Sequence, residues 1–195
     1  MTQVAIFCSG SGSNAEALMR HFQFHKDIKI SLLIYNRKEA GAKEKAEKFG
    51  IPSKYVPKAV FEDDSIAVVD ILMKAGIDYI LLAGFLLLIP PSIVEAYPDR
   101  ILNIHPALLP EFGGKGMHGT FVHQAVKNSG ANRTGISIHI VDLEYDKGKI
   151  LFQSACPVWE TDSESDIAAR VLVLEHLHYS LVAEQYIISK KEKKV

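Results

Sequence analysis

Cysteine is scarce in this sequence of 195 residues: there are two, Cys8 and Cys156, and each lies in an apolar segment typical of a strand. A disulfide-stabilised fold is therefore not predicted, and two buried thiols in a reducing compartment are expected. Long apolar runs are also missing, since the longest covers residues 79–89 and a membrane-spanning helix needs roughly 20 residues. The N-terminus lacks a basic leader followed by an apolar stretch, so a cytoplasmic protein without a membrane anchor is predicted.

Neither sign of charge dominates, because 22 basic side chains are balanced by 23 acidic ones and the net charge is −1. Binding to nucleic acid or to a membrane surface, which usually requires a basic excess, is therefore not predicted. One concentration of charge lies at the end of the chain, where residues 190–195 include four lysines. We expect this segment to be a disordered basic tail, and residues 1–189 to form a single domain.

Short apolar segments alternate with helical patterns along the chain, which is typical of a mostly parallel sheet covered by helices. Strands are predicted at residues 4–8, 28–35, 53–56, 77–83, 100–105, 134–141 and 150–157. Helices are predicted at residues 13–22, 42–49, 61–75 and 117–128, with a last long helix from about residue 164. The predicted fold class is α/β: a Rossmann-like open, mostly parallel sheet with helices on both faces.

Two predicted helices begin with the spacing of a capping box, in which a Ser or Thr and an acidic residue three positions later satisfy free backbone amides. These sequences are Ser13–Glu16 and Thr161–Glu164. The last helix is expected to bury one face, which consists of Ile167, Val171, Leu174, His178 and Leu181.

A glycine- and serine-rich loop separates the first predicted strand from the first predicted helix. After Ser9 it consists of Gly10, Ser11, Gly12, Ser13 and Asn14. Glycine lets the backbone turn sharply and approach a ligand closely. Free amides at the start of a helix attract anions, and ligands of open α/β sheets bind beyond the carboxyl ends of the strands. The loop therefore predicts a site for a phosphate group.

A dinucleotide site is an alternative use of this loop, because Gly10, Gly12 and Ala15 fit the pattern G-x-G-x-x-G/A. Such a site usually has an acidic residue at the end of the second strand, where it binds the ribose hydroxyls. Here that strand is followed by Asn36 and Arg37. An NADP-type site using Arg37 stays open, but a single phosphate monoester fits the loop better.

Two polar side chains, Asn103 and His105, interrupt an otherwise apolar predicted strand at its carboxyl end. Because residues two apart on a strand point to the same side, both are expected to lie where ligands bind. An amide can donate to a developing oxyanion, and a histidine can donate or accept a proton at the same centre. The pair therefore predicts a catalytic site.

A carboxylate is also needed, to orient the imidazole or to accept a proton from an amine. Asp142, Glu144 and Asp146 all follow the strand predicted at 134–141, and their spacing does not choose among them. The remaining histidines and the two cysteines lack the spacing of metal ligands, so no metal site is predicted.

Five stretches of the sequence together resemble the phosphoribosylglycinamide formyltransferase family, folate-dependent enzymes of purine synthesis. They are S-G-S-G-S-N at 9–14, L-A-G-F at 82–85, N-I-H-P-A-L-L-P at 103–110, T-G-I-S-I-H at 134–139 and D-K-G at 146–148. The resemblance implies transfer of the formyl group of 10-formyltetrahydrofolate to the amine of glycinamide ribonucleotide. It implies folate as a cosubstrate, with no bound cofactor and no metal.

The resemblance also implies a role for each candidate residue. Asn103 would bind the formyl oxygen, protonated His105 would stabilise the tetrahedral intermediate, and Asp146 would assist removal of the amine proton. The loop Gly10–Asn14 would hold the ribotide phosphate, and Glu175 would contact the ribotide.

Two further segments would line the pterin pocket according to the same resemblance. The residues expected there are Leu86, Leu87, Leu88, Ile89, Val141, Asp142 and Glu144. Many relatives have an arginine where this sequence has Leu87, so any polar contact made by that arginine would be absent here.

Several rival functions can be told apart by domain content or by simple assays. Methionyl-tRNA formyltransferases have an extra C-terminal domain and formyltetrahydrofolate deformylases an extra N-terminal one, and neither is expected here. An NADP-dependent reductase would use the glycine loop but would not need Asn103 and His105. A non-catalytic nucleotide sensor would bind the ribotide without turnover. The sequence leaves the oligomeric state open between monomer and homodimer.

Overall fold

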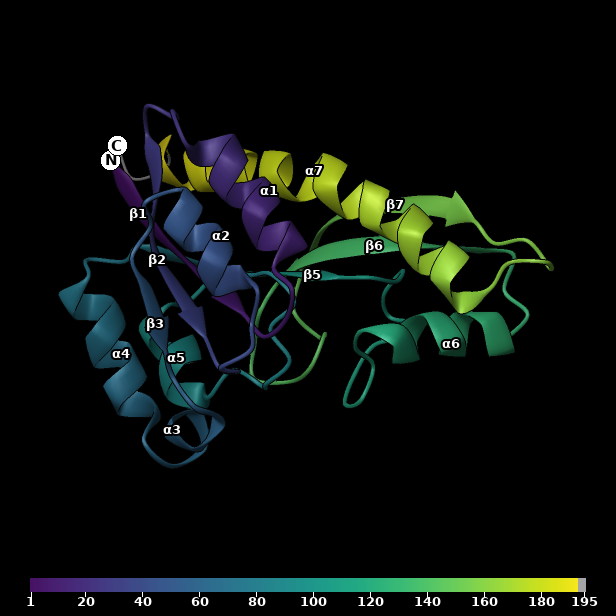
Figure 1. The fold of residues 1–195 in the computed structure, drawn as a ribbon, viewed down its shortest axis with the longest axis horizontal. Helices are drawn as coiled ribbons and strands as arrows, with labels where there is room; N and C mark the ends of the chain where they lie inside the picture. The colour runs from purple at the N-terminus through teal and green to yellow at the C-terminus, as the bar shows by residue number, and fades with distance from the viewer. Residues whose placement is uncertain (193–195) are drawn as a thin grey trace.

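The computed structural model describes residues 1–192, which form one seven-stranded sheet with helices on both faces (Figure 1). The strands are β1 (Thr2–Cys8), β2 (Ile28–Tyr35), β3 (Ser53–Tyr55), β4 (Tyr79–Leu82), β5 (Ile101–His105), β6 (Arg133–Ile140) and β7 (Ile150–Pro157). The helices are α1 (Ser13–Phe22), α2 (Ala42–Lys48), α3 (Lys58–Asp63), α4 (Ser65–Lys74), α5 (Pro91–Ala96), α6 (Thr120–Asn128) and α7 (Glu164–Glu192). The predicted Rossmann-like α/β fold is confirmed.

The order of the strands creates a crevice in the middle of the sheet. The order is β3-β2-β1-β4-β5-β6-β7, with β1 to β5 parallel and with β6 and β7 joined by antiparallel pairing. The chain moves outward from β1 to β3 and then returns to the other side of β1 with β4. Ligands of open sheets bind where the strand order reverses in this way, at the carboxyl ends of the strands.

Each face of the sheet has its own apolar core. Helices α1, α2 and α7 pack on one face around residues such as Leu18, Ala46 and Val171, whereas α3, α4 and α5 pack on the other around Phe61 and Leu72. Figure 1 shows α1, α2 and α7 together above the sheet and α3, α4 and α5 together below it. Because both faces are covered, central strands such as β1 and β4 are apolar on both sides.

The structure differs from the sequence prediction on the side of α3 to α5. The helix predicted at 61–75 is two helices, because Asp64 leaves the helical conformation at φ −144° and accepts a hydrogen bond from the Ala67 amide. An aspartate in this position starts a new helix by satisfying one of its free amides. The short helix α5, with Pro91 in its first turn, was not predicted.

The start of α7 is capped two residues later than predicted. The box lies at Ser163 and Asp166 instead of Thr161 and Glu164: the Ser163 amide donates to the Asp166 carboxylate, and the Asp166 amide donates to the Ser163 hydroxyl. The reciprocal pair satisfies two backbone amides at the helix start, as a capping box requires.

The buried face of α7 agrees with the prediction only at its beginning. Ile167 and Val171 are buried, but Leu181 is 46% exposed. The positions that continue the buried face are Glu175, Tyr179, Ala183 and Ile187. Tyr179 explains the change, because its hydroxyl donates to the carbonyl oxygens of both Leu82 and Leu102 and so fixes α7 across β4 and β5.

The end of α7 also corrects the predicted tail. Lys190 and Lys191 are helical, and their ammonium groups pair with the carboxylates of Asp99 (3.3 Å) and Asp27 (3.1 Å). The part of the predicted tail at Lys190 and Lys191 is therefore helical, and residues 193–195 of the predicted tail lie outside the described residues. In residues 1–192, no helix combines the length and the apolar character that crossing a membrane requires.

Candidate active site

A cavity of about 760 Å³ lies at the carboxyl ends of β1, β4 and β5, where the strand order reverses. This volume is within the range of small-molecule sites. One wall is apolar and consists of Leu82, Phe85, Leu86, Leu87, Leu88, Ile89 and Val141. A second group of lining residues is polar and consists of Asn103, His105, His123, His139, Glu144 and Asp146. Gly10, Asn14 and Glu175 contribute a third side.

The turn from β1 into α1 requires glycine at position 12 for two separate reasons. Gly12 has φ +77°, which is unfavourable for residues with a Cβ. A Cβ at this position would also lie 2.7 Å from the Cα of Ala42, at the start of α2. Gly12 is the N-cap of α1, and none of the described side chains caps this helix end. The first amides of α1 are therefore available to an anion.

The serines of this loop have different roles. Ser9 is buried and structural: its hydroxyl accepts a hydrogen bond from the Leu86 amide, and its amide donates to the Gly84 carbonyl oxygen. This contact joins the loop to the apolar wall. Of the predicted phosphate residues, Gly10 and Asn14 line the cavity, whereas Ser11, Gly12 and Ser13 are not among its lining residues in the described part of the chain.

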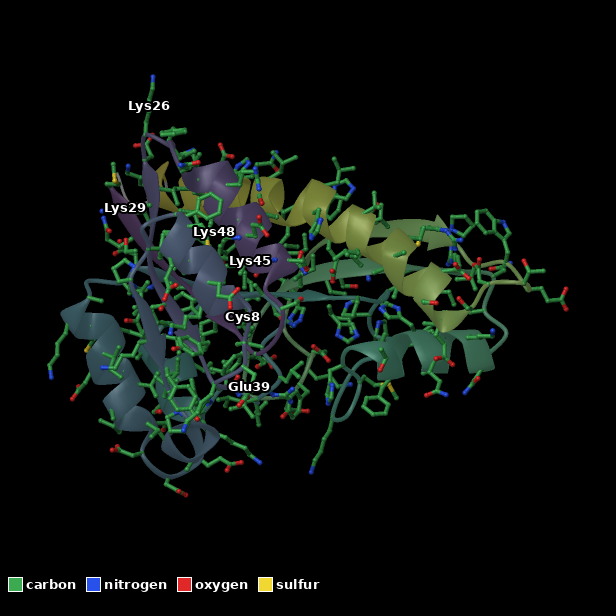
Figure 2. The ribbon with its side chains drawn as sticks, viewed as in Figure 1. Cys8, Lys26, Lys29, Glu39, Lys45 and Lys48 are labelled. Atoms are coloured by element: carbon green, nitrogen blue, oxygen red, sulfur yellow. The ribbon has the colours of Figure 1, made fainter. Side chains whose placement is uncertain are left out.

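The capping box predicted at Ser13–Glu16 is not formed. Glu16 pairs instead with Lys45 of α2 at 2.8 Å and with Arg20 at 3.1 Å. Figure 2 shows Lys45 beside α1, near Cys8 at the end of β1. Cys8 and Cys156 are both buried thiols, as predicted. Because Glu16 is held by α2, it leaves the start of α1 to a ligand.

Asn14 and Glu175 meet at the third side of the cavity. The Asn14 Nδ2 donates to Oε2 of Glu175 at 2.9 Å, although the two residues are 161 positions apart. Burial raises the pKa of Glu175, and the hydrogen bond from Asn14 opposes this only partly. The Oδ1 atom of Asn14 is buried and has no hydrogen-bond partner within residues 1–192. This side of the cavity therefore offers the Glu175 carboxyl group to a ligand.

His105 is buried at the end of β5, and both ring nitrogens face protein groups. Its Nε2 donates to the Phe112 carbonyl oxygen at 2.8 Å, and its Nδ1 lies 3.6 Å from Oδ2 of Asp146. Burial lowers the pKa of His105, while Asp146 acts in the opposite direction. Burial therefore disfavours the protonated form of His105 that the resemblance implied for the reaction.

Asp146 is the carboxylate that lies beside the histidines. Besides its contact with His105, its Oδ1 is 3.4 Å from Nε2 of His139, and its Oδ2 accepts a hydrogen bond from the Gly114 amide at 2.9 Å. Burial opposes ionisation, but contacts with His139, His105 and Gly114 outweigh it and lower the pKa of Asp146. The residue has φ +56°, a strained conformation that is frequent at functional sites.

The other two acidic candidates lie elsewhere. Glu144 lines the cavity, but Asp142 is not among the residues that line it in the described part of the chain. The Asp142 carboxylate accepts a hydrogen bond from the Glu144 amide and so shapes the turn.

Of the residues expected around the pterin, Leu86, Leu87, Leu88, Ile89, Val141 and Glu144 line the cavity. Arg37, which a dinucleotide site would use, is exposed and is also not among the lining residues.

His139 was not predicted to be a site residue, although it lies in the stretch T-G-I-S-I-H at 134–139 that resembles the family. Its Nε2 lies 3.0 Å from Nδ2 of Asn103, and its Nδ1 lies 2.9 Å from the Ile140 carbonyl oxygen. Alternation along β6 carries the signal, because Ser137 and His139 are both polar, both buried and two residues apart. Ser137 is structural: its hydroxyl donates to Ala107 and accepts from the Leu109 amide.

His123 is a second histidine for which no role was predicted from the sequence. It lies on α6, is 7% exposed and lines the cavity. Burial lowers its pKa, and His105 adds to the effect. Its Nδ1 is buried without a hydrogen-bond partner among the described residues. Within residues 1–192 there is no group of three His, Cys, Asp or Glu side chains suited to a metal ion.

Two glycines make the polar side of the cavity possible. A Cβ at Gly135 on β6 would overlap the Ser154 carbonyl oxygen of β7. A Cβ at Gly148 would overlap the Ile140 carbonyl oxygen at the end of β6. Both glycines belong to the recognised stretches 134–139 and 146–148, and their role is to let two backbones approach closely.

Comparisons with known proteins agree with this geometry. The chain is 47% identical over 182 residues to a chloroplastic phosphoribosylglycinamide formyltransferase of Arabidopsis thaliana, which covers 91% of this chain but 62% of that relative. It is 36% identical over 192 residues to the phosphoribosylglycinamide formyltransferase of Bacillus subtilis, which covers 95% and 94% of the two chains. The chain thus spans about three-fifths of the plant relative and nearly all of the bacterial one.

A solved structure shows the same fold over nearly the whole length. The crystal structure of phosphoribosylglycinamide formyltransferase from Bacillus halodurans superposes with a TM-score of 0.87 at 32% identity, covering 94% of each chain. The formyl transferase family matches residues 2–183. A match over this much of the sequence, together with these relatives, shows that the chain belongs to the formyl transferase family.

Proposed function

We propose that this protein transfers the formyl group of 10-formyltetrahydrofolate to the amine of glycinamide ribonucleotide, a step of purine biosynthesis. The observation that carries the proposal is the composition of the cavity. One continuous space is bordered by a helix start that can bind an anion, by an apolar wall and by a polar cluster. These three features correspond to a phosphate, a flat heterocycle and a reacting centre. Relatives that match most of this chain have the corresponding name.

The phosphate end of the ribotide would bind at Gly10–Asn14. Support comes from the first amides of α1, which carry the positive end of the helix dipole and are not capped by a described side chain. Glu175, which lines the cavity and is held by Asn14, would accept hydrogen bonds from donors on the ribotide. The pterin would lie along Leu86, Leu87, Leu88, Ile89 and Val141, with Glu144 beside it.

The chemistry needs a nucleophilic amine, an oxyanion site and a route for one proton. The amine nitrogen attacks the formyl carbon, a C–N bond forms, and the formyl oxygen becomes an oxyanion. Asn103 donates an N–H to that oxygen, and His105 donates Nε2–H after it leaves the Phe112 carbonyl oxygen. Asp146 accepts the proton of the amine, directly or through a water molecule. The bond from the formyl carbon to the folate nitrogen then breaks, and that nitrogen takes up a proton.

The folate donor is a cosubstrate in this proposal, and no metal or bound cofactor takes part. A cytoplasmic location and a monomeric or homodimeric state remain predictions from the sequence. The chloroplastic plant relative indicates that the compartment varies among similar proteins.

The test is to incubate the purified protein with 10-formyltetrahydrofolate and to follow the release of tetrahydrofolate with and without glycinamide ribonucleotide. Release that depends on the ribotide supports the proposal. Release without the ribotide contradicts it and indicates a hydrolase of the deformylase type. Absence of release under both conditions also contradicts it, and titration with the ribotide alone then identifies a nucleotide sensor.

A further inference from the structure

His139 lies directly across the sheet from Asn103, because the antiparallel register of β5 and β6 pairs these two residues. Its side chain is 2% exposed. Its Nδ1 lies 2.9 Å from the Ile140 carbonyl oxygen. Its Nε2 lies 3.0 Å from Nδ2 of Asn103 and, at the longer distance of 3.4 Å, from Oδ1 of Asp146.

A carbonyl oxygen can only accept a hydrogen bond, so Nδ1 of His139 carries the proton. In a neutral imidazole the other nitrogen is then an acceptor. Nε2 therefore accepts a hydrogen bond from Nδ2 of Asn103. This contact uses one N–H of the amide and leaves the second N–H for a ligand in the cavity that Asn103 lines.

We propose that His139 is a positioning residue for formyl transfer: it orients Asn103 so that an N–H, rather than the amide oxygen, is available to the formyl oxygen. This inference rests on the proposed function. Without the acceptor at Nε2, the amide of Asn103 is able to rotate by half a turn. Its Oδ1 atom would then point at the formyl oxygen and repel the developing negative charge, so turnover would fall while substrate binding would change little.

Three substitutions at this position separate the contact with Asn103 from the rest of the side chain. His139→Gln keeps an acceptor near the position of Nε2. His139→Asn keeps only a donor near Nδ1, which can reach the Ile140 carbonyl oxygen, and His139→Leu keeps neither. We expect His139→Leu and His139→Asn to lower kcat by about 10- to 100-fold, below the roughly 10²–10³-fold cost of losing an oxyanion donor entirely. KM for either substrate should change less than about three-fold, and His139→Gln should stay within about five-fold of the wild-type kcat.

A double-mutant cycle with Asn103→Ala tests whether His139 acts through Asn103. If it does, adding His139→Leu to Asn103→Ala lowers kcat by less than about two-fold further, because groups that act as a unit are not additive. If the kcat losses of the two single variants multiply in the double mutant, the proposal is overturned. Equal kcat values for His139→Gln and His139→Asn would also overturn it. Wild-type kcat in His139→Leu would also overturn it.

A measurement without turnover keeps the inference separate from the proposed function. Protein labelled with ¹⁵N in its histidines reports the tautomer of His139 by NMR, with His139→Gln used to assign the signal. A neutral ring protonated at Nδ1 supports the proposal, and a ring protonated at Nε2 or at both nitrogens overturns it. This result does not depend on the activity of the wild type or on the folding of the leucine variant. If the wild type does not transfer formyl groups but His139 has the expected tautomer, only the proposed function is contradicted.

Discussion

The two sides of the cavity are built in different ways, one by the parallel half of the sheet and the other by its antiparallel half. On the parallel side, the loop after β1 and the wall after β4 each depend on residues close together in the sequence. On the antiparallel side, Asn103 and His139 are 36 positions apart and meet because β5 and β6 pair in one particular register. The first side follows from local rules, and the second depends on tertiary structure.

The two sides of the cavity are also expected to have different functions. The parallel side offers helix amides and apolar surface, which bind a ligand without changing it. The antiparallel side brings a carboxylate, an amide and two histidines into contact, which are groups that move protons and stabilise charge. Substitutions on the parallel side should therefore change KM, and those on the antiparallel side should change kcat.

The largest effect is expected when the reacting groups are removed. Asn103→Ala and His105→Ala should each lower kcat by about 10²–10³, which corresponds to roughly 2.7–4 kcal/mol of lost transition-state stabilisation. Initial rates of tetrahydrofolate release measure this loss. His25→Ala is a suitable control, because His25 pairs with Glu184 on α7 and is not among the residues that line the cavity. Turnover close to that of the wild type in either variant would contradict the assignment of these residues.

A smaller but still large effect is expected for Gly148→Ala. The new Cβ would overlap the Ile140 carbonyl oxygen, so the backbone that carries Asp146 has to move. A displacement of about 1 Å in a catalytic group can cost roughly 10²-fold in rate. Steady-state kinetics should show a lower kcat with little change in KM. Gly130→Ala is the matched control, since Gly130 has φ +70° but open space around it.

An effect on binding rather than on turnover is expected for Gly12→Ala. The methyl group would approach Ala42, and φ +77° would strain the alanine, so the start of α1 would be displaced. We expect KM for the ribotide to rise about ten-fold, or roughly 1.4 kcal/mol, while KM for the folate stays nearly constant. Gly50→Ala has similar strain at φ +65° in open space and should leave both KM values unchanged. A Gly12→Ala variant with a lower kcat and an unchanged KM would contradict the assignment of binding to the parallel side and of catalysis to the antiparallel side.

The last prediction concerns stability at acid pH rather than binding or turnover. Burial lowers the pKa of both His105 and His123 below the ordinary value of 6.5, so the unfolded chain binds protons first as the pH falls. Stability is therefore complete above pH 6.5 and decreases below it, by at most about 1.4 kcal/mol per pH unit for each histidine. Thermal unfolding measured between pH 5 and 8 should show this slope. His123→Gln should reduce it, and an unchanged slope would show that His123 does not contribute.

The parallel side was predictable from the sequence because its signals are local. The strand 28–35 and the helix 13–22 were predicted with the bounds that the structure has. The loop Gly10–Asn14 was recognised from its glycines, and its position follows from the strand and helix beside it. The split of helix 61–75 was missed, because a single aspartate, Asp64, acts as a cap only when the backbone leaves the helix there.

The antiparallel side was predictable only in part. Alternation along the strand placed Asn103 and His105 on one side, and resemblance to a family selected Asp146 from three carboxylates. Alternation along β6 places Ser137 and His139 on one side of that strand, but nothing local indicates that β6 pairs with β5 in this register. The contact of His105 with Phe112 was equally unpredictable, because it depends on how the long loop after β5 folds back.

The sequence by itself determined the fold class, the glycine-rich turn after the first strand and the side of the sheet on which the polar residues lie. These features follow from periodicity, from glycine and from helix starts, which act over a few residues. Tertiary structure alone decided which face of α7 is buried and in which direction the pKa of His105 is shifted. Each of these depends on packing between segments far apart in the chain, because burial and pairing set the energies of polar groups.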